Sequence, residues 1–389
     1  MKGFGNNHRT NKKPTEKKVK SIQKDNLITK ALSLHSNGKI KEASEIYNFL
    51  IQNKFYDPRV LNNLGSIYSQ IKQFDKAILL FNESIKKFPN SLEAYTNLAS
   101  ILVIKGRSDT AKNVLKKAIE LNPNYLKPYS NLASIYVGEG DFKEAEVLLR
   151  KSVGINSKDV NTLVNLGCVL KDLGKPKEAE KFLRNALKIN PTYEIVLTNL
   201  GSVLNELEKI EEGERYLRKA LNINPASPMA LNNLGNILSK KKNNSEAEFC
   251  YRKAIEIKSD FSLAYNNLAS LLSRQGKLSE AEQFTEKAIF YNPKFDLAYV
   301  NLGLIKIDLD KSLEAEELFL SAIEINKNYN YAYRNLFRLY EKINDISKLK
   351  TKIESLKENK NFINEILMFK ARISFREKDF ITAKKLIDQ

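Results

Sequence analysis

The stretch "LNNLGNIL" (residues 231–238) decides the fold, because close copies of it recur along the 389-residue chain. It appears earlier as "LNNLGSIY" (residues 61–68) and later as "YNNLASLL" (residues 265–272). Its apolar residues stand three and four positions apart, the spacing that places side chains on one face of an α-helix. Asn233 interrupts this pattern, although asparagine is a mediocre helix former whose side chain competes for backbone hydrogen bonds. An amide kept at such a position needs an explanation beyond helix packing.

Three residue types recur along the chain with a step of 34 residues. The asparagines of the first series are Asn63, Asn97, Asn131, Asn165, Asn199, Asn233, Asn267, Asn301 and Asn335. The small residues of the second series are Ala43, Ala77, Ala111, Ala145, Ala179, Gly213, Ala247, Ala281 and Ala315. The prolines of the third series are Pro89, Pro123, Pro191, Pro225 and Pro293. This agreement at one period identifies internal repeats, which dominate the sequence.

One unit, residues 126–159, predicts a helical hairpin. Tyr129 opens a run of helical spacing that ends at Gly140, a residue able to adopt the left-handed conformation that terminates helices. A second helical pattern follows, and the small residues Ala133 and Ala145 are expected where the two helices cross. A hairpin this short cannot bury its own apolar face, so stacking on its neighbours must supply the missing burial.

The repeated pattern resembles that of a known repeat family. Tyr or Leu, then Leu followed by Gly or Ala, then Ala, a large apolar residue and Pro, at a 34-residue period, resemble the tetratricopeptide repeat. The resemblance covers residues 24–389: ten complete units begin at residues 24, 58, 92, 126, 160, 194, 228, 262, 296 and 330, and an eleventh, 364–389, is cut short at Gln389. It implies an all-α fold, a right-handed α-solenoid or superhelix of tandem 34-residue helical hairpins, with the first helices lining the concave face.

The positive charge is densest at the N-terminus. The formal net charge is +18, of which residues 1–23 contribute +6 from seven basic residues and Glu16. This segment has no apolar periodicity, so we expect a disordered basic arm ahead of the array. The remaining +12 is spread over the repeats rather than gathered on one strongly basic face.

Other sequence features exclude several classes of protein. Cys168 and Cys250 provide neither a disulfide framework nor the spacing of metal ligands. The first 30 residues contain no apolar h-region, and no run of about 18 uncharged apolar residues occurs, so we expect neither a signal peptide nor a transmembrane helix. Walker, GxGxxG, HExxH and CxxC motifs are absent, and neither His8 nor His35 has a Ser or Cys partner in its own or a neighbouring unit. We therefore expect a cytoplasmic protein with no catalytic residues, no metal, no cofactor and no transmembrane segment.

The C-terminal units depart from the pattern. Phe337 and Leu349 occupy the two small-residue positions of the tenth unit, so we expect its hairpin to be splayed or tilted. The array also lacks the polar capping helix that such arrays usually need for solubility. We expect either that Gln389 belongs to a longer protein, or that self-association or another partner covers this end.

The asparagine series is the predicted binding site. On a first helix each asparagine shares a face with the residue three positions later, and the leucines on the other side face the hairpin interior. An Asn amide offers both a donor and an acceptor, which match the N–H and C=O groups of an extended peptide. We therefore predict peptide binding by the nine asparagines of the series together with Ser202 and Asn236.

The family resemblance supports this prediction and leaves an alternative open. It places the asparagine face in the concave groove, where the similar repeat array of O-linked N-acetylglucosamine transferases holds the backbone of its target with matching asparagines. Only the nine asparagines are carried over. A second interpretation is that Asn before Leu–Gly, which is common in tetratricopeptide repeats, satisfies local backbone groups or solvates the face.

Two smaller sets of residues complete the site predictions. Arg334 and Arg338 share one face of the tenth unit, and Arg372 and Arg376 share one face of the eleventh, which predicts an anion site or else a solvated charged face. The Lys–Asn pair of a chaperone-tail carboxylate clamp is missing, so that function is rejected. The tyrosines that share one repeat position are predicted to be core: Tyr95, Tyr129, Tyr265, Tyr299 and Tyr333.

Three functions remain. The first is a non-enzymatic scaffold that binds an extended protein segment along the concave face. The second is the substrate-recognition arm of a glycosyl- or sulfo-transferase whose catalytic part is missing or separately encoded. The third is nucleic-acid binding through the basic arm, which is disfavoured because the repeat face carries Asn and Ser instead of aromatic side chains that stack on bases.

Overall fold

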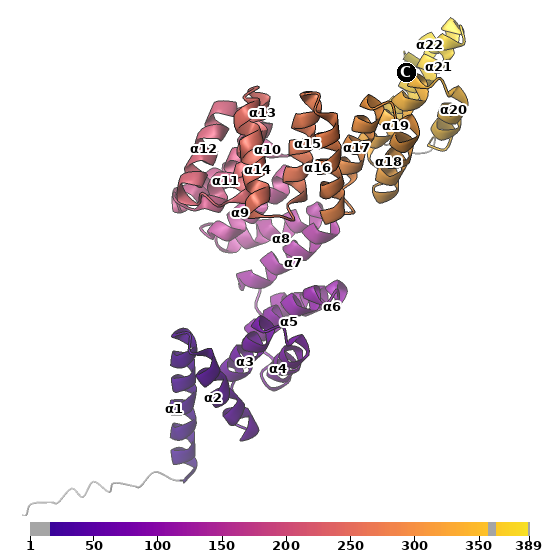
Figure 1. The fold of residues 1–389 in the computed structure, drawn as a ribbon. Coiled ribbons are helices and arrows are strands. Elements are labelled where there is room, and N and C mark those ends of the chain that lie inside the picture. The colour runs from indigo at the N-terminus through magenta and orange to yellow at the C-terminus, as the bar shows by residue number, and fades with distance from the viewer. Residues whose placement is uncertain (1–15, 357–362, 388–389) are drawn as a thin grey trace, which may run out of the picture. The chain divides into compact units, whose positions relative to one another are not determined.

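The computed structural model describes residues 16–356 and 363–387, and in those residues it contains 22 α-helices and no strand. The helices alternate between a first and a second helix of successive hairpins, and the two helices of each hairpin pack against each other (Figure 1). The all-α fold built from tandem helical hairpins is therefore confirmed.

The helix bounds follow the predicted 34-residue step. The first helices are α1 (Glu16–Ser36), α3 (Pro58–Gln70), α5 (Leu92–Ile104), α7 (Leu126–Glu139), α9 (Val160–Asp172), α11 (Glu194–Glu206), α13 (Pro228–Lys240), α15 (Ser262–Arg274), α17 (Asp296–Asp308), α19 (Asn330–Lys342) and α21 (Ile363–Arg376). The second helices are α2 (Ile40–Gln52), α4 (Phe74–Lys87), α6 (Ser108–Leu121), α8 (Phe142–Ile155), α10 (Pro176–Ile189), α12 (Ile210–Ile223), α14 (Asn244–Ile257), α16 (Leu278–Tyr291), α18 (Ser312–Ile325), α20 (Ile346–Glu354) and α22 (Phe380–Ile387).

The chain divides into two compact units between Ile189 and Asn190. The first unit holds the hairpins from α1–α2 to α9–α10, and the second holds those from α11–α12 to α21–α22. Within each unit, second helices also pack against the next first helix, and most consecutive first helices touch one another. Each unit is thus a stretch of α-solenoid whose first helices lie side by side.

The N-terminal arm is partly outside the described residues. Helix α1 begins at Glu16, so residues 16–23 of the segment expected to be a disordered arm are helical. Residues 1–15 lie outside the part of the chain that the structure describes.

Small residues set the distance between the two helices of a hairpin. Ala133 and Ala145 are both buried, as predicted for the crossing of α7 and α8. Where the first-helix position is glycine, a large side chain from the second helix fills the space: a Cβ on Gly235 would lie 2.6 Å from Cε1 of Tyr251. The size of one residue therefore matches the size of its partner across the hairpin, as close packing requires.

The turns inside the hairpins share one backbone conformation. Gly140 ends α7 in the left-handed region with φ of 81°, which confirms the prediction made from its sequence position. The same register position has positive φ in all described hairpins: Gly38, Lys72, Gly106, Gly140, Gly174, Glu208, Lys242, Gly276, Asp310, Asn344 and Lys378. The turn geometry is therefore a property of the repeat, and it is kept even where the residue is not glycine.

The tenth hairpin differs from the others in the length and packing of its second helix, and the splay or tilt expected from its bulky residues stays a prediction. Helix α20 is only 9 residues long and packs less extensively against α19 than other second helices do against their partners. Phe337 and Leu349 are nevertheless fully buried. The ring of Phe337 meets that of Phe369 on α21 edge-to-face with centroids 5.0 Å apart, so the extra bulk is taken up by the next hairpin.

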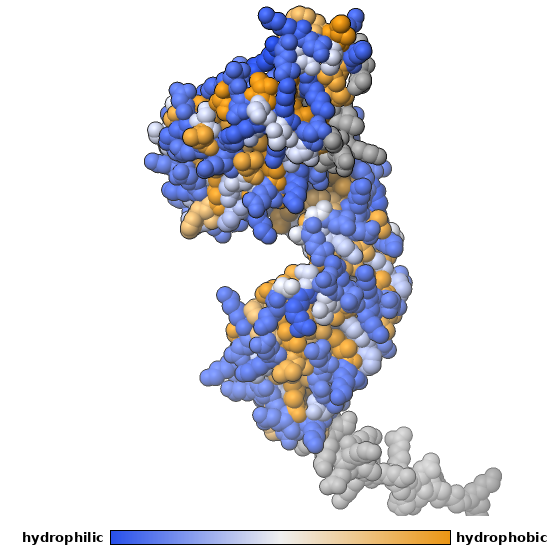
Figure 2. Space-filling model, turned by 90° about the vertical axis from the view of Figure 1, so that its right-hand side faces the viewer, coloured by the Kyte–Doolittle hydropathy of each residue, from blue (hydrophilic) through white to orange (hydrophobic). Residues whose placement is uncertain are grey.

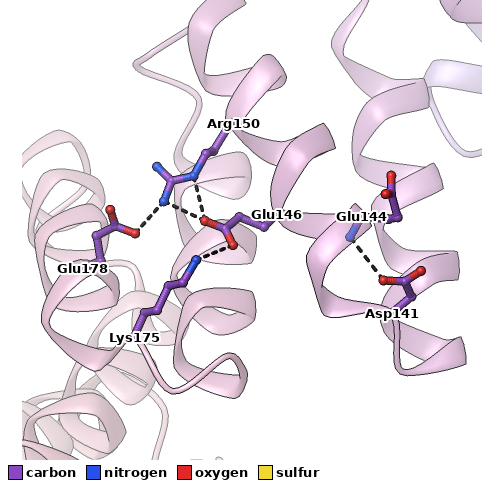
Figure 3. A network of polar contacts seen from close by, with 6 residues as sticks. All are labelled: Asp141, Glu144, Glu146, Arg150, Lys175 and Glu178. Atoms are coloured by element: carbon purple, nitrogen blue, oxygen red, sulfur yellow. Dashed lines mark hydrogen bonds and ion pairs between the residues drawn. The ribbon is translucent and has the colours of Figure 1, made fainter.

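Ion pairs on the second helices join successive hairpins. Arg150 on α8 bonds Glu146 four residues earlier and also Glu178 at the start of α10 (Figure 3). Lys175, in the turn just before α10, bonds Glu146 at 2.7 Å. The hydrogen bonds from Lys175 and Arg150 hold the pKa of the Glu146 carboxyl below its usual value. Figure 3 also shows Asp141, which caps α8 by accepting from the backbone N–H of Glu144.

The same network returns in the second unit. Arg218 bonds Glu214 and Glu246, both at 2.8 Å, and Lys241 bonds Glu214 at 2.7 Å. Arg252 repeats the arrangement with Glu248 and Glu280. We call these contacts the second-helix ion pairs.

The exposed surface is mostly hydrophilic on the face drawn in Figure 2, with apolar patches between the polar residues. Among the described helices, none combines the length and apolar character that crossing a membrane requires.

Candidate peptide-binding surface

The predicted asparagines lie along the first helices, at the side where these helices approach one another. Each precedes a buried leucine, such as Leu132 after Asn131 and Leu166 after Asn165. Because the leucine side chain packs into the hairpin core, the side chain of the preceding asparagine lies on the adjacent side of the helix, outside that core. We call the surface formed by these asparagines and the residues three positions later the first-helix face, and it is considered separately for each unit.

Exposure differs along the series. Asn165 is exposed, Asn335 is only 5 % exposed, and the other members are partly buried. Nδ2 of Asn335 donates to the carbonyl of Tyr331 at 2.8 Å, within its own helix. Asn335 therefore presents almost no surface to a ligand.

Several members of the series bond the preceding hairpin. Nδ2 of Asn267 donates to Oδ1 of Asn232 at 2.9 Å, and Nδ2 of Asn301 donates to Oδ1 of Asn266 at 2.8 Å. Nδ2 of Asn97 lies 3.5 Å from Oγ of Ser66. These amides link neighbouring first helices, a structural role that neither interpretation of the series predicted.

Three further predicted contact residues bond groups of their own hairpin or of the adjacent one. Nδ2 of Asn199 donates to the carbonyl of Ile195 at 3.0 Å. Asn63 contacts the hydroxyl of Tyr47. Oδ1 of Asn236 accepts from the Tyr251 hydroxyl at 2.7 Å, so this predicted contact residue is already engaged.

Three asparagines have no side-chain partner among the described residues: Asn131, Asn165 and Asn233. Asn131 and Asn165 stand on α7 and α9, consecutive first helices of the first unit that touch each other. Each free amide retains its donors and its acceptor for a ligand. Ser202, on α11, is partly buried.

The residues three positions after the asparagines keep the face neutral. Ser66, Ser100 and Ser134 donate their hydroxyls to carbonyls one turn earlier in the same helix, at 2.9, 3.0 and 3.0 Å. Cys168 occupies the same position on α9, and burial raises the pKa of its thiol. The first-helix face of the first unit therefore offers small uncharged groups around its free amides.

Sequence reasoning missed the residue immediately before each asparagine. Asn232 and Asn266 hold Asn267 and Asn301 from the neighbouring hairpin, and the signal was present in the sequence as the pair "NN". Asn62 belongs to the same set: its Nδ2 donates to Oγ of Ser91 at 3.0 Å, and its Oδ1 is buried without a hydrogen-bond partner. The residue one place before the series thus ties two of the amides, those of Asn267 and Asn301.

The predicted tyrosines lie in the core, with one exception. Tyr95, Tyr129, Tyr265 and Tyr333 are buried, whereas Tyr299 is partly exposed. Tyr129 and Tyr299 both donate their hydroxyls to the carbonyl of the proline six residues earlier, at 3.0 and 3.3 Å. The prediction that this position is used for packing is confirmed for the four buried residues.

The predicted arginine site is only partly assembled. Arg372 and Arg376 line a cavity of about 480 Å³ together with Glu341. The Glu341 carboxylate pairs with Arg372 at 2.9 Å, and the Glu341 carbonyl accepts from Arg376 at 3.4 Å. Arg334 and Arg338 do not line that cavity. An anion bound there would have to compete with Glu341, and the site stays a prediction.

The C-terminal hairpin exposes apolar side chains, among them Phe375 on α21 and Ile381 and Ile387 on α22. Self-association or another partner at this hairpin stays a prediction. Elsewhere, the described residues contain no group of three or more His, Cys, Asp or Glu that could hold a metal ion.

The stacked hairpins, with paired small residues at the crossings of all but the tenth, define the class of helical-repeat proteins. A family model described as the Cilia and flagella-associated protein 70 C-terminal domain matches residues 19–264, and two tetratricopeptide-repeat models match residues 250–283 and 297–329. The chain belongs to this family of tetratricopeptide repeat domains.

Solved structures agree on the fold. A tetratricopeptide repeat protein from Parabacteroides merdae is 23% identical, with a TM-score of 0.54 over 64% of this chain and 98% of that one. The human IFIT1 dimer with m7Gppp-AAAA is 18% identical, with a TM-score of 0.59 over 92% of this chain and 87% of that one. These likenesses show a shared repeat architecture. No curated protein matches the sequence.

Proposed function

We propose that the chain is a protein-interaction scaffold that binds an extended peptide segment on the first-helix face, with Asn131 and Asn165 as its principal contacts in the first unit and Asn233 in the second. The observation that carries the proposal is the contrast within the asparagine series: most amides are engaged by the protein, and these three are not. Consecutive free amides on touching helices suit a ligand that presents N–H and C=O groups at regular intervals.

The amides that already bond a neighbouring hairpin reduce the number of asparagines available to a peptide. Asn267 and Asn301 each use one N–H in a contact with the neighbouring hairpin, so they retain only part of their hydrogen-bonding capacity. The proposed contact surface is therefore narrower than the full series that the sequence predicts. The small uncharged residues of the first-helix face in the first unit also suit main-chain recognition, which does not depend on the sequence of the ligand.

The test is peptide binding by the full chain carrying Asn131→Ala and Asn165→Ala together. Each hydrogen bond contributes about 0.5–1.5 kcal/mol, so losing two should weaken binding roughly 5- to 140-fold. Fluorescence anisotropy with a labelled library of extended 12-residue peptides would measure the change, and circular dichroism would show that helicity is kept.

The matched control is Asn113→Ala. Asn113 is exposed on α6, a second helix of the same unit, and so lies outside the first-helix face. This variant should bind like the unmodified chain. Equal affinity of the double variant and the control for all peptides would refute the proposal.

A further inference from the structure

A cavity of about 260 Å³ opens between the first helices α5 and α7 of the first unit. Its apolar lining includes Val103, Leu115 and Ile135, and its polar lining consists of Ser100, Asn131 and Ser134. Leu115 and Ile135 are buried, whereas Val103 is 38 % exposed. The cavity therefore lies directly beside one of the free amides of the first-helix face.

The chemistry of the lining restricts what the cavity can hold. No ionisable side chain lines it, so a carboxylate or phosphate would find no cation. No aromatic side chain lines it either, so a nucleobase would find no ring on which to stack. The hydroxyl hydrogens of Ser100 and Ser134 are already donated to their own helices, which leaves Asn131 as the free polar group. The matching occupant has an aliphatic part next to a main-chain amide.

We propose that this cavity binds one aliphatic side chain of the extended segment while Asn131 bonds the adjacent main-chain amide. The proposal rests on the proposed function and adds a ligand class to it: segments that carry Val, Leu, Ile or Met at one position. Removing such a side chain from water into an apolar site corresponds to roughly 10- to 100-fold in affinity.

A single apolar cavity would fix the register of the bound segment. Amides that contact only main-chain groups allow a peptide to slide by two residues, since alternate side chains of an extended chain point to the same side. One side chain that must enter the cavity removes this freedom. The residue at the Val103 position differs along the array, for example Ser69, Lys171 and Glu341, so an equivalent apolar lining is not repeated in every hairpin.

The test uses the full chain and 12-residue fluorescent peptides with an Ala- and Ser-rich background. One central position is set in turn to Leu, Ile, Val, Met, Ala, Phe, Asp or Lys, and anisotropy gives each Kd. The unmodified chain should prefer the aliphatic peptides to the Ala peptide by roughly 10- to 100-fold. Val103→Phe, which fills the cavity from a partly exposed position, should abolish this preference and leave binding of the Ala peptide unchanged.

Two further variants separate the contribution of the cavity to peptide binding from that of the rest of the first-helix face. Val137→Phe stands at the same register position on α7, outside the cavity lining, and should keep the aliphatic preference. Asn131→Ala should weaken binding of all peptides by a similar factor. Binding without an aliphatic preference, or a preference that survives Val103→Phe, would overturn the cavity proposal and leave the proposed function standing. Absence of binding by every peptide would overturn both.

Discussion

At the residue scale, the amide series shows how far one side chain can be understood from the sequence. The 34-residue step predicted on which helix and on which side each asparagine lies. It did not predict that Asn267 and Asn301 are tied to the hairpin before them. Those bonds depend on a second asparagine 35 residues earlier, and so on contacts between hairpins that the pattern within one repeat does not describe. Only the contacts between hairpins show which asparagine amides are engaged by the protein and which remain available to a ligand.

The hairpin turns provide a prediction at this scale. Lys242 is exposed and adopts φ of 61°, a conformation that costs a residue with a Cβ about 1–2 kcal/mol. Lys242→Gly removes this strain but gives the unfolded chain more freedom, so the net gain should be about 0.5–1 kcal/mol. Urea unfolding followed by circular dichroism measures it. Gly276→Ala, at the same position one repeat later with φ of 76°, should lower stability instead. Destabilisation by Lys242→Gly would contradict this account.

At the element scale, the two helices of a hairpin are held at a distance set by one small residue and its large partner. The sequence predicted the small residues and their positions, because they share the repeat register. The partner that fills the remaining space varies: Phe81 faces Gly65, Leu183 faces Gly167 and Tyr251 faces Gly235. This pairing depends on volume across the crossing, which a pattern of apolar and polar residues does not contain.

A substitution at the crossing of α13 and α14 tests the pairing. The Cβ of Gly235→Ala would lie 2.6–2.9 Å from three ring atoms of Tyr251, whose hydroxyl is held by Asn236. Despite the higher helix propensity of alanine, we expect a loss of about 1–3 kcal/mol in unfolding free energy.

The control is the double variant Gly235→Ala with Tyr251→Leu. It recreates the Ala–Leu combination present at Ala99 with Leu115 and at Ala133 with Leu149. A double-mutant cycle should show that the two changes together cost less than the sum of their separate costs. Additive losses would mean that the clash is not the cause.

At the scale of the whole molecule, each unit is stabilised by contacts between neighbouring hairpins, as in other repeat proteins. The sequence predicted this from the period alone. It did not predict the division between Ile189 and Asn190, because the repeat register continues across that point without change. Nor did it identify the second-helix ion pairs that join successive hairpins, such as Arg150–Glu178 and Arg218–Glu246, because the pattern within one repeat does not describe contacts between repeats.

The ion pairs predict how stability depends on pH. Hydrogen bonds from Lys175 and Lys241 are the largest causes that lower the pKa of Glu146 and Glu214 below the ordinary value of 4.5. A carboxyl whose pKa is lower in the folded state stabilises the fold above the ordinary pKa, and this contribution is lost as pH falls through the lowered pKa. Urea unfolding between pH 7 and pH 3 should therefore show falling stability at the acidic end. Glu146→Gln with Glu214→Gln should reduce this pH dependence, and an unchanged pH profile would contradict the role given to the two carboxyls.

The spacing of these ion pairs bears on how the length of the array can change. Arg218 bonds Glu246, and Glu280 stands at the corresponding place one repeat later. If residues 228–261 were deleted, Arg218 would meet Glu280 instead, so loss or duplication of a whole repeat keeps the charges complementary. The tenth hairpin breaks this rule, because Lys348 stands where the acidic residue is expected and pairs with Glu316. Where an arginine pairs with a glutamate 28 residues later, as Arg150, Arg218 and Arg252 do, growth or shortening by a whole repeat would keep the pair.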